Sequence, residues 1–160
     1  MIQFQDPPQG GVKVRVIGVG NAGGMITKRV ARERLPGVEC SAINTAIKDL
    51  GSCPEIRTLQ IGAALTKGNG AGMDPKVGAK AALEDANRIR DFLGSNDIVL
   101  LIAGFGKGTG TGATPEIGVM ARELGALTFA FVTTPFAHEP RSHHENAAGG
   151  LANLPEKVDA

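Results

Sequence analysis

The fold of this chain is constrained most by a set of short glycine turns. Each turn follows an apolar run and precedes a helical pattern. Residues 12–19 form a β-branched run that ends at Gly20, and residues 97–104 form a nearly continuous apolar run before a second glycine loop. Strand, glycine turn and helix alternate in this way along the chain. The alternation predicts an α/β fold, a Rossmann-like, doubly wound and mainly parallel sheet with helices on both faces. A ligand of such a fold lies beyond the carboxyl ends of the strands.

The expected elements follow from apolar runs and from apolar residues at helical spacing. We expect strands at residues 12–19, 38–43, 56–61, 97–104 and 126–133, the last two buried on both faces. We expect helices at residues 21–34, in a short stretch ending at 50, from Pro75 along a stripe to Leu93, and at 116–124, with a weakly helical end. Residues 1–11 are expected to be a flexible lead, and residues 12–160 a single domain.

Composition excludes several classes of function. The chain carries 17 Lys and Arg against 16 Asp and Glu and has neither Trp nor Tyr, so it offers neither the charge nor the aromatic platform of a nucleic-acid binder. Cys40 and Cys53 have no zinc-ligand spacing, which favours a reduced, cytoplasmic protein. No run is apolar enough for a spanning helix or a signal peptide, so we expect no direct membrane contact.

Three glycine loops carry the chemistry. Residues 18–23 read G-x-G-x-x-G, a pattern that lets backbone N–H groups approach a phosphate but also serves tight turns without a ligand. Residues 104–112 alternate five glycines with other residues, which is typical of a nest of backbone donors for an anion. The third loop, residues 67–74, contains Gly68, Gly70 and Gly72 and is expected at the same sheet edge. Three such loops predict a ligand with several phosphates.

These residues resemble the tubulin/FtsZ family over about residues 12–159. Residues 106–112 (GKGTGTG) match the family signature GGGTGTG, with Lys107 at its second glycine; we define them as the signature loop. Residues 18–24 resemble the family's first phosphate loop, residues 42–45 its second, residues 65–72 its third, on the γ-phosphate side, and residues 133–139 its sugar loop. The resemblance implies GTP or GDP as ligand, with Mg²⁺ on the phosphates.

The resemblance assigns nucleotide contacts to positions in all five segments. They are Gly20, Asn21, Ala22 and Gly23; Asn44 and Thr45; Gly70, Ala71 and Gly72; Gly106, Lys107, Gly108, Thr109, Gly110, Thr111 and Gly112; and Thr133, Pro135, Glu139 and His143.

Several positions depart from the family pattern. Met25 stands where the family usually has Asn, Ala46 where it has Asp after Asn-Thr, and His143 where it has Arg; Pro140 replaces a typical glycine. These changes are expected to weaken nucleotide binding or alter sugar and base contacts. Lys107 either adds a counter-charge to the phosphates or points to water.

The resemblance also implies segments that we do not find in these residues. In the family a long central helix, an acidic catalytic loop and a second domain follow, so we assign no catalytic residue and expect GTP binding with little or no hydrolysis. Hydrolysis is expected to need the acidic loop of a neighbouring FtsZ-like subunit in a head-to-tail contact through the nucleotide face. The histidines near residues 138–144 are expected to be exposed rather than metal ligands.

Two alternatives remain open. An NAD(P)-binding Rossmann enzyme normally has an acidic residue near the end of its second strand, where this chain has Asn44 and Thr45. A non-hydrolysing filament regulator or capping module is favoured by Met25, Ala46 and His143 and opposed by the glycine loops.

Overall fold

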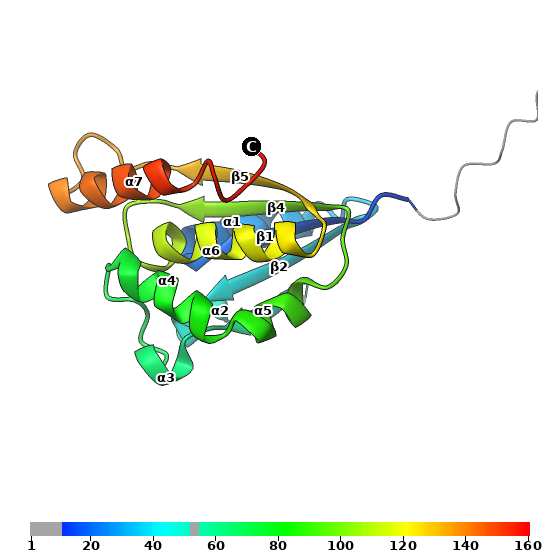
Figure 1. The fold of residues 1–160 in the computed structure, drawn as a ribbon, viewed down its shortest axis with the longest axis horizontal. Coiled ribbons are helices and arrows are strands. Elements are labelled where there is room, and N and C mark those ends of the chain that lie inside the picture. Colours follow the sequence, from blue (N-terminus) through cyan, green and yellow to red (C-terminus); the bar gives the residue numbers. More distant parts are fainter. Residues whose placement is uncertain (1–10, 52–54) are drawn as a thin grey trace, which may run out of the picture.

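The computed structural model describes residues 11–51 and 55–160 and contains one five-stranded sheet (Figure 1). The strands are β1 (Val14–Val19), β2 (Val38–Asn44), β3 (Arg57–Gln60), β4 (Ile98–Gly104) and β5 (Leu127–Thr133). The helices are α1 (Gly20–Arg32), α2 (Ile47–Leu50), α3 (Ala63–Thr66), α4 (Pro75–Glu84), α5 (Ala86–Leu93), α6 (Thr109–Glu123) and α7 (Arg141–Asn153).

All strand pairs are parallel, in the order β3-β2-β1-β4-β5. The central strand β1 pairs Val14 with Val38 of β2 on one side and with Ile98 of β4 on the other. The strand order therefore reverses between β1 and β4, which is the position where doubly wound sheets bind their ligands. The predicted fold class is confirmed.

Helices lie on both faces of the sheet (Figure 1). Helix α1 contacts β1, β2 and β4, whereas α6 contacts β4 and β5 on the other face and is itself covered by α4, α5 and α7. The main core lies between these layers, and its largest fully buried side chains are Ile17, Ile43, Ile61, Ile89, Leu93, Leu101 and Ile117. Cys40 packs against a smaller cluster of Ala42, Leu50 and Ile56.

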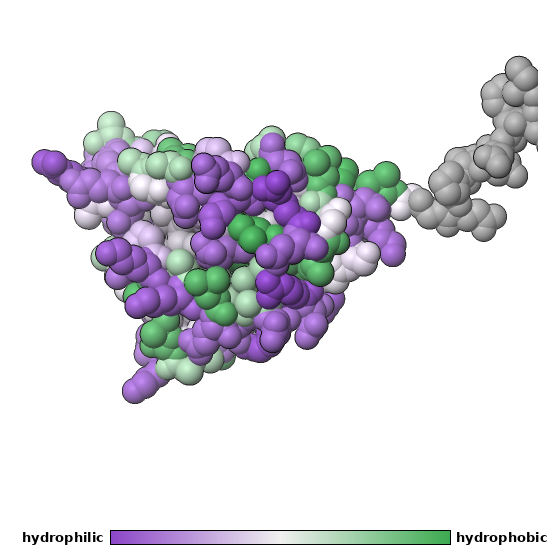
Figure 2. Space-filling model, in the orientation of Figure 1, coloured by the Kyte–Doolittle hydropathy of each residue, from purple (hydrophilic) through white to green (hydrophobic). Residues whose placement is uncertain are grey.

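The outer face of the helical layer is mainly polar. Figure 2 shows hydrophilic side chains over most of the face that α4, α5, α6 and α7 present, with smaller apolar spots between them. Arg90 of α5 and Glu123 of α6 form one of the ion pairs of this layer, at 2.6 Å between Nη2 and Oε2. Across the described residues, every helix falls short of the length and apolar character that a bilayer crossing requires.

Two expected elements differ from the structure. The stripe from Pro75 to Leu93 is not one helix, because the chain leaves helical geometry at Asp85 (φ −103°, ψ 23°). The Asp85 carboxylate accepts a hydrogen bond from the Gly62 backbone N–H at 2.7 Å, so a tertiary contact holds this residue in place. Helix α6 begins at Thr109 rather than at 116 and includes the end of the signature loop.

The expectation of a fully buried last strand is wrong. β5 lies at the edge of the described sheet, and its Leu127 and Phe131 are 47% and 60% exposed. Its other neighbour is the end of the chain, where the Ala130 N–H donates to the Ala160 carbonyl at 2.8 Å. Nearly all of the predicted lead at 1–11, and Cys53, lie outside the described residues.

Candidate functional site

A cavity of about 710 Å³ opens at the carboxyl ends of the strands. Five segments line it: the start of α1, the turn after β2, the third loop, the signature loop and the turn after β5. Most of the positions singled out from the sequence contribute to its wall: Gly20, Asn21, Ala22, Asn44, Gly70, Ala71, Gly72, Gly106, Lys107, Gly108, Thr109, Gly110, Thr133, Pro135, Glu139 and His143. The fold thus brings together residues separated by more than 100 positions.

Two helix N-termini meet at this cavity. α1 begins at Gly20 and α6 at Thr109; neither has a side-chain cap hydrogen bond, and neither has an acidic residue in its first turn. The first backbone N–H groups of a helix have no partner within the helix and carry partial positive charge. By contrast, the Asp74 carboxylate caps α4 by accepting from the Lys76 N–H at 2.8 Å. The uncapped starts of α1 and α6 are therefore suited to an anionic ligand.

Glycine allows these two helix starts to touch. Gly20 adopts φ +74°, and a Cβ there would lie 2.9 Å from the Gly110 backbone nitrogen. A Cβ on Gly110 would in turn lie 2.5 Å from the Gly104 carbonyl oxygen. Both glycines are thus required for the close approach that concentrates backbone donors at one point.

The second loop is organised by its own hydrogen bonds. The Asn44 side-chain oxygen accepts from the backbone N–H groups of Thr45, at 2.8 Å, and Ala46, at 3.3 Å, which fixes the turn after β2. Thr45 is fully buried, and its hydroxyl lies 2.7 Å from the hydroxyl of Thr109. This bond joins the second loop to the start of α6.

The third loop is tied to the second at its beginning. The Ile47 N–H donates to the Gly68 carbonyl at 3.1 Å, and Ala46 and Asn69 form an isolated antiparallel bridge. Gly70 and Gly72, by contrast, line the cavity with φ values of +89° and +57°. This part of the loop has the left-handed backbone that glycine allows, and it presents main chain to the cavity.

The turn after β5 holds a carboxylate at the cavity. Glu139 accepts a hydrogen bond from the Phe136 N–H at 2.9 Å, and its other oxygen lies 3.0 Å from His143 Nδ1. The Phe136 N–H, and next the His143 ring, hold the pKa of Glu139 below its ordinary value, and the charge of Lys107 adds a smaller contribution in the same direction. The Phe136 ring stacks on the His138 ring at 5.8 Å between centroids.

Four predicted contact residues lie outside the lining of this cavity. Thr45 and Thr111 are buried, and the Thr111 hydroxyl accepts from the Gly106 N–H at 2.8 Å. Gly23 lets α1 approach β4, since a Cβ there would lie 2.0 Å from the Ile102 carbonyl oxygen. Gly112 lets α6 approach α4, with only 1.9 Å between a Cβ and the Pro75 carbonyl oxygen. In the structure these four residues support the loops, and their predicted direct contact stays a prediction.

Several lining residues were not assigned to the site from sequence. They are Val19, Met25, Ala46, Lys48, Asp49, Asn69, Met73, Gly104, Phe105, Thr134 and Phe136. Met25, Met73 and Phe136 are 67%, 60% and 72% exposed, unusual values for large apolar side chains. Exposure is invisible in the sequence, but the positions of Met25 and Met73 directly after glycine loops were a usable signal.

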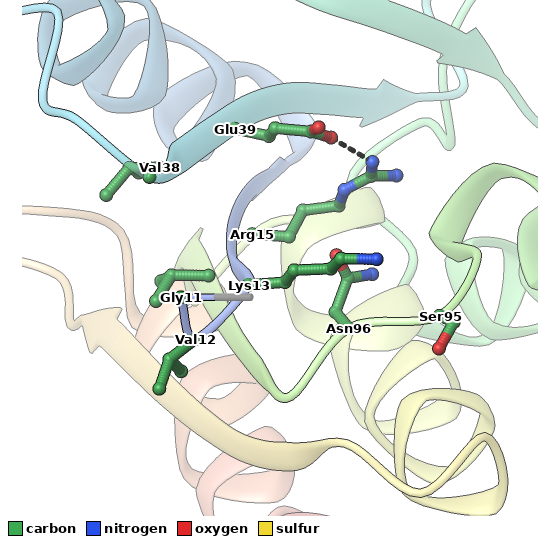
Figure 3. A pocket seen from close by; sticks show the side chains of 10 residues that line it. Gly11, Val12, Lys13, Arg15, Val38, Glu39, Ser95 and Asn96 are labelled. Atoms are coloured by element: carbon green, nitrogen blue, oxygen red, sulfur yellow. Dashed lines mark hydrogen bonds and ion pairs between the residues drawn. The ribbon is translucent and has the colours of Figure 1, made fainter. Parts of the chain in front are cut away.

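A second cavity, of about 450 Å³, lies at the opposite, amino end of the sheet (Figure 3). Its central side chain, Arg15, is only 8% exposed and is engaged by the protein itself. The guanidinium donates to the carbonyls of Phe92 and Leu93 at the end of α5. It also pairs with Glu39 of β2 (Figure 3). Its Nε is buried without a hydrogen-bond partner among the described residues and is closed to a ligand. The charge at this end thus joins β1, β2 and α5.

Within residues 11–51 and 55–160, no three His, Cys, Asp or Glu side chains lie close enough to hold a metal ion. Burial raises the pKa of the Cys40 thiol, as expected for a packing residue. The lining of the large cavity combines the backbone donors of two helix starts with Lys48, Lys107 and His143, a set of groups that suits an anionic ligand.

Comparison with known proteins agrees with this architecture. The GTPase-domain model of the Tubulin/FtsZ family matches residues 13–160. The chain is 44% identical over its full length to the cell division protein FtsZ of Aquifex aeolicus, and 44% identical over 147 residues to that of Pseudomonas aeruginosa. It spans 42% and 37%, respectively, of the length of these relatives.

Solved structures show the same fold. An FtsZ dimer structure from M. jannaschii superposes with a TM-score of 0.89 at 38% identity, covering 95% of this chain and 44% of that one. GDP-bound CetZ1 from Haloferax volcanii gives a TM-score of 0.83 at 28% identity, covering 92% and 49%. With the family match over nearly all of its residues, the chain belongs to the tubulin/FtsZ family and carries sequence of that family's GTPase domain.

Proposed function

We propose that this chain is a guanine-nucleotide-binding domain of an FtsZ-like cell-division GTPase that acts in the cytoplasm. The observation that carries the proposal is the meeting of two uncapped helix N-termini, at Gly20 and Thr109, in one cavity. The Tubulin/FtsZ match and the GDP-bound CetZ1 neighbour support guanine as the base. The family match gives no support to an NAD(P)-dependent enzyme, and the end of β2 offers Asn44 and Thr45 rather than an acidic residue.

The cavity fits a nucleotide in size and in chemistry. Its volume of about 710 Å³ lies within the range of small-molecule sites, roughly 300–1,000 Å³. The phosphates would lie on the backbone donors of α1 and α6, and Glu139 beside the turn after β5 would face the ribose. Magnesium would be held mainly by phosphate oxygens, because Asp49 and Glu139 are the only carboxylates among the lining residues and Glu139 is already bonded to Phe136 and His143.

The carboxylates in the cavity lining lead us to expect slow hydrolysis by this chain alone. Glu139 is already bonded to Phe136 and His143, and the resemblance assigns the positioning of the attacking water to the acidic loop of a neighbouring subunit. We therefore expect a head-to-tail contact in which the nucleotide face of this chain meets the acidic-loop face of an FtsZ-like subunit. The regulator alternative would use the same nucleotide face to bind the end of a filament and block further addition.

The proposal is tested by binding and by turnover. Nucleotide released from the purified protein by denaturation is identified by chromatography, and GTP, GDP, ATP and NAD are then titrated onto the stripped protein with and without magnesium. We expect GTP and GDP to bind with clear preference over ATP and NAD, and hydrolysis to be barely detectable. A preference for NAD, or no preference among the four, would overturn the assignment.

A sedimentation assay distinguishes between the two proposed roles of this chain, a GTPase domain and a capping module. Substoichiometric amounts of nucleotide-loaded protein are added to an assembling FtsZ, and polymer mass is measured. Met25 and Ala46 at the cavity favour the regulator because each replaces a polar residue of the family pattern, and His143 favours it because it replaces an arginine. A fall in polymer mass supports end capping, whereas constant polymer mass with fully loaded protein contradicts it.

A further inference from the structure

A side chain outside the cavity joins two of its loops. Asn146 lies in α7, and its Nδ2 donates to the Met73 carbonyl of the third loop at 3.1 Å and to the Gly106 carbonyl of the signature loop at 3.2 Å. Both partners are carbonyl acceptors, so the NH₂ group of the Asn146 side chain, and not its oxygen, must face them. One amide thus bridges loops that are more than 30 residues apart in sequence.

Helix α7 is a firm support for this bridge. Ala147 is 3% exposed, and Gly150 allows the helix to lie directly on the start of α6, since a Cβ there would lie 2.6 Å from Thr111 Cγ2 and 2.9 Å from the Phe105 ring. Asn146 therefore projects from a helix that is itself packed on the start of α6.

The third loop depends on such external contacts. Met73 has φ +61°, a left-handed backbone that costs energy for a residue other than glycine and persists only when its surroundings hold it. On the other side of the loop, Gly108 packs against Ala71 and Asp74, with 2.7 Å between a Cβ on Gly108 and the Ala71 Cβ. The end of the third loop is thus held between Gly108 and Asn146.

We infer that Asn146 is a positioning residue that holds the third loop closed on the cavity and thereby sets the preference for a nucleoside triphosphate over a diphosphate. The inference rests on the proposed function. A diphosphate would be bound chiefly by the starts of α1 and α6, whereas the additional phosphate would depend on the backbone of residues 70–72. Release of Met73 would move that backbone and leave the donors of α1 and α6 in place.

The test compares Asn146→Ala and Asn146→Asp with Asn153→Ala, a matched control in the exposed last turn of the same helix. Hydrogen exchange in the nucleotide-free proteins reports the loop, because the Asp74 N–H donates to the Ala71 carbonyl at 3.0 Å across the turn that contains Met73, so release of Met73 should expose this amide. Dissociation constants for GTP and GDP report the preference, and the thermal midpoint Tm reports folding.

For Asn146→Ala we expect faster exchange at residue 74, GTP binding weaker by roughly five- to thirtyfold, and GDP binding within about twofold of the original. Asn146→Asp should give the larger loss, because its carboxylate would face two carbonyl oxygens. Unchanged exchange, or equal losses for GTP and GDP, would overturn the inference. If the original protein binds neither nucleotide, the proposed function fails, while the exchange experiment still decides whether Asn146 closes the loop.

Discussion

The two ends of the sheet treat polar groups in opposite ways. At the amino end, the buried Arg15 is engaged by Phe92, Leu93 and Glu39. At the carboxyl end, the helix starts at Gly20 and Thr109 lack side-chain caps, and backbone donors face a larger cavity. A charge that the protein itself satisfies contributes to stability, whereas donors left open are available for a ligand. The difference indicates that mutations at the two ends should separate folding from binding.

The largest loss of stability is expected at Gly112, a glycine near the carboxyl end of the sheet that packs against α4. In Gly112→Ala the new Cβ would lie 1.9 Å from the Pro75 carbonyl oxygen and 2.8 Å from the Ala79 nitrogen, both backbone atoms of α4. We expect a loss of about 3 kcal/mol or more in the free energy of unfolding, measured by urea denaturation. Gly149→Ala is the control: it is in a helix with nothing within 4 Å of a Cβ and should stabilise the protein by about 0.5–1 kcal/mol. Equal stability of the two variants would contradict this account of Gly112.

Arg15→Met tests the amino end. It removes a charged donor from the carbonyls at the end of α5, and we expect a loss of about 2–3 kcal/mol in stability with nucleotide affinity unchanged. Arg141→Met is the control, because the Arg141 side chain is 92% exposed and its ion pair with Glu145 should contribute less than about 1 kcal/mol. A stability loss no greater than that of the control would mean that Arg15 is not needed to hold this end together.

Asn21→Asp tests the carboxyl end without disturbing packing. A negative charge in the first turn of α1 should leave stability unchanged or raise it slightly, through the helix dipole. The same charge should repel phosphates and weaken GTP and GDP binding about tenfold or more, with the loss shrinking as salt is added. Asn87→Asp makes the identical change in the first turn of α5, away from the cavity. Weaker binding in both variants would show a non-specific effect of charge.

The smallest effect concerns Glu139. Because hydrogen bonds lower its pKa in the folded protein, ionised Glu139 adds stability above its ordinary pKa of 4.5, and this contribution is lost as the pH falls through that value toward the lower folded pKa. The Tm of the original protein should therefore exceed that of Glu139→Gln near pH 7, and the two should converge once the pH falls below the folded pKa of Glu139. Glu145→Gln, at an exposed pair, should change Tm little at either pH. A difference that persists or grows in acid would contradict this sign.

Sequence reasoning located the strands to within a residue or two because β-branched runs bounded by glycine have few other solutions. It could not see the break at Asp85, because the hydrogen bond from Gly62 is a tertiary contact 23 residues away. Nor could it see that Leu127 and Phe131 are exposed, since an apolar run does not reveal which strand forms the edge of a sheet. The local sequence pattern thus predicts where the strands lie, whereas the break at Asp85 and the exposure of β5 depend on tertiary contacts.

The site was predictable as a set of loops but not as a set of contacts. The G-x-G-x-x-G pattern contains both Gly20, which lines the cavity, and Gly23, which packs against Ile102. The spacing of the glycines does not show which of them contacts a ligand and which serves packing. Asn146 had no motif at all. Its two partners, Met73 and Gly106, are brought together only by the tertiary fold.

The central position of β1 has a consequence for the order in which the molecule is made. β1 can pair with β2 once both have been made, but its other edge has no partner until β4 is made: Lys13 and Asp97, which meet at the amino end, are 84 residues apart. At about 5–20 residues per second, translation covers that interval in about 4–17 s. The start of α6, which follows β4, arrives later still. During synthesis the half formed by β1, β2 and β3 therefore precedes the anion-binding cavity, and a nucleotide can stabilise the chain only after the start of α6 has been made.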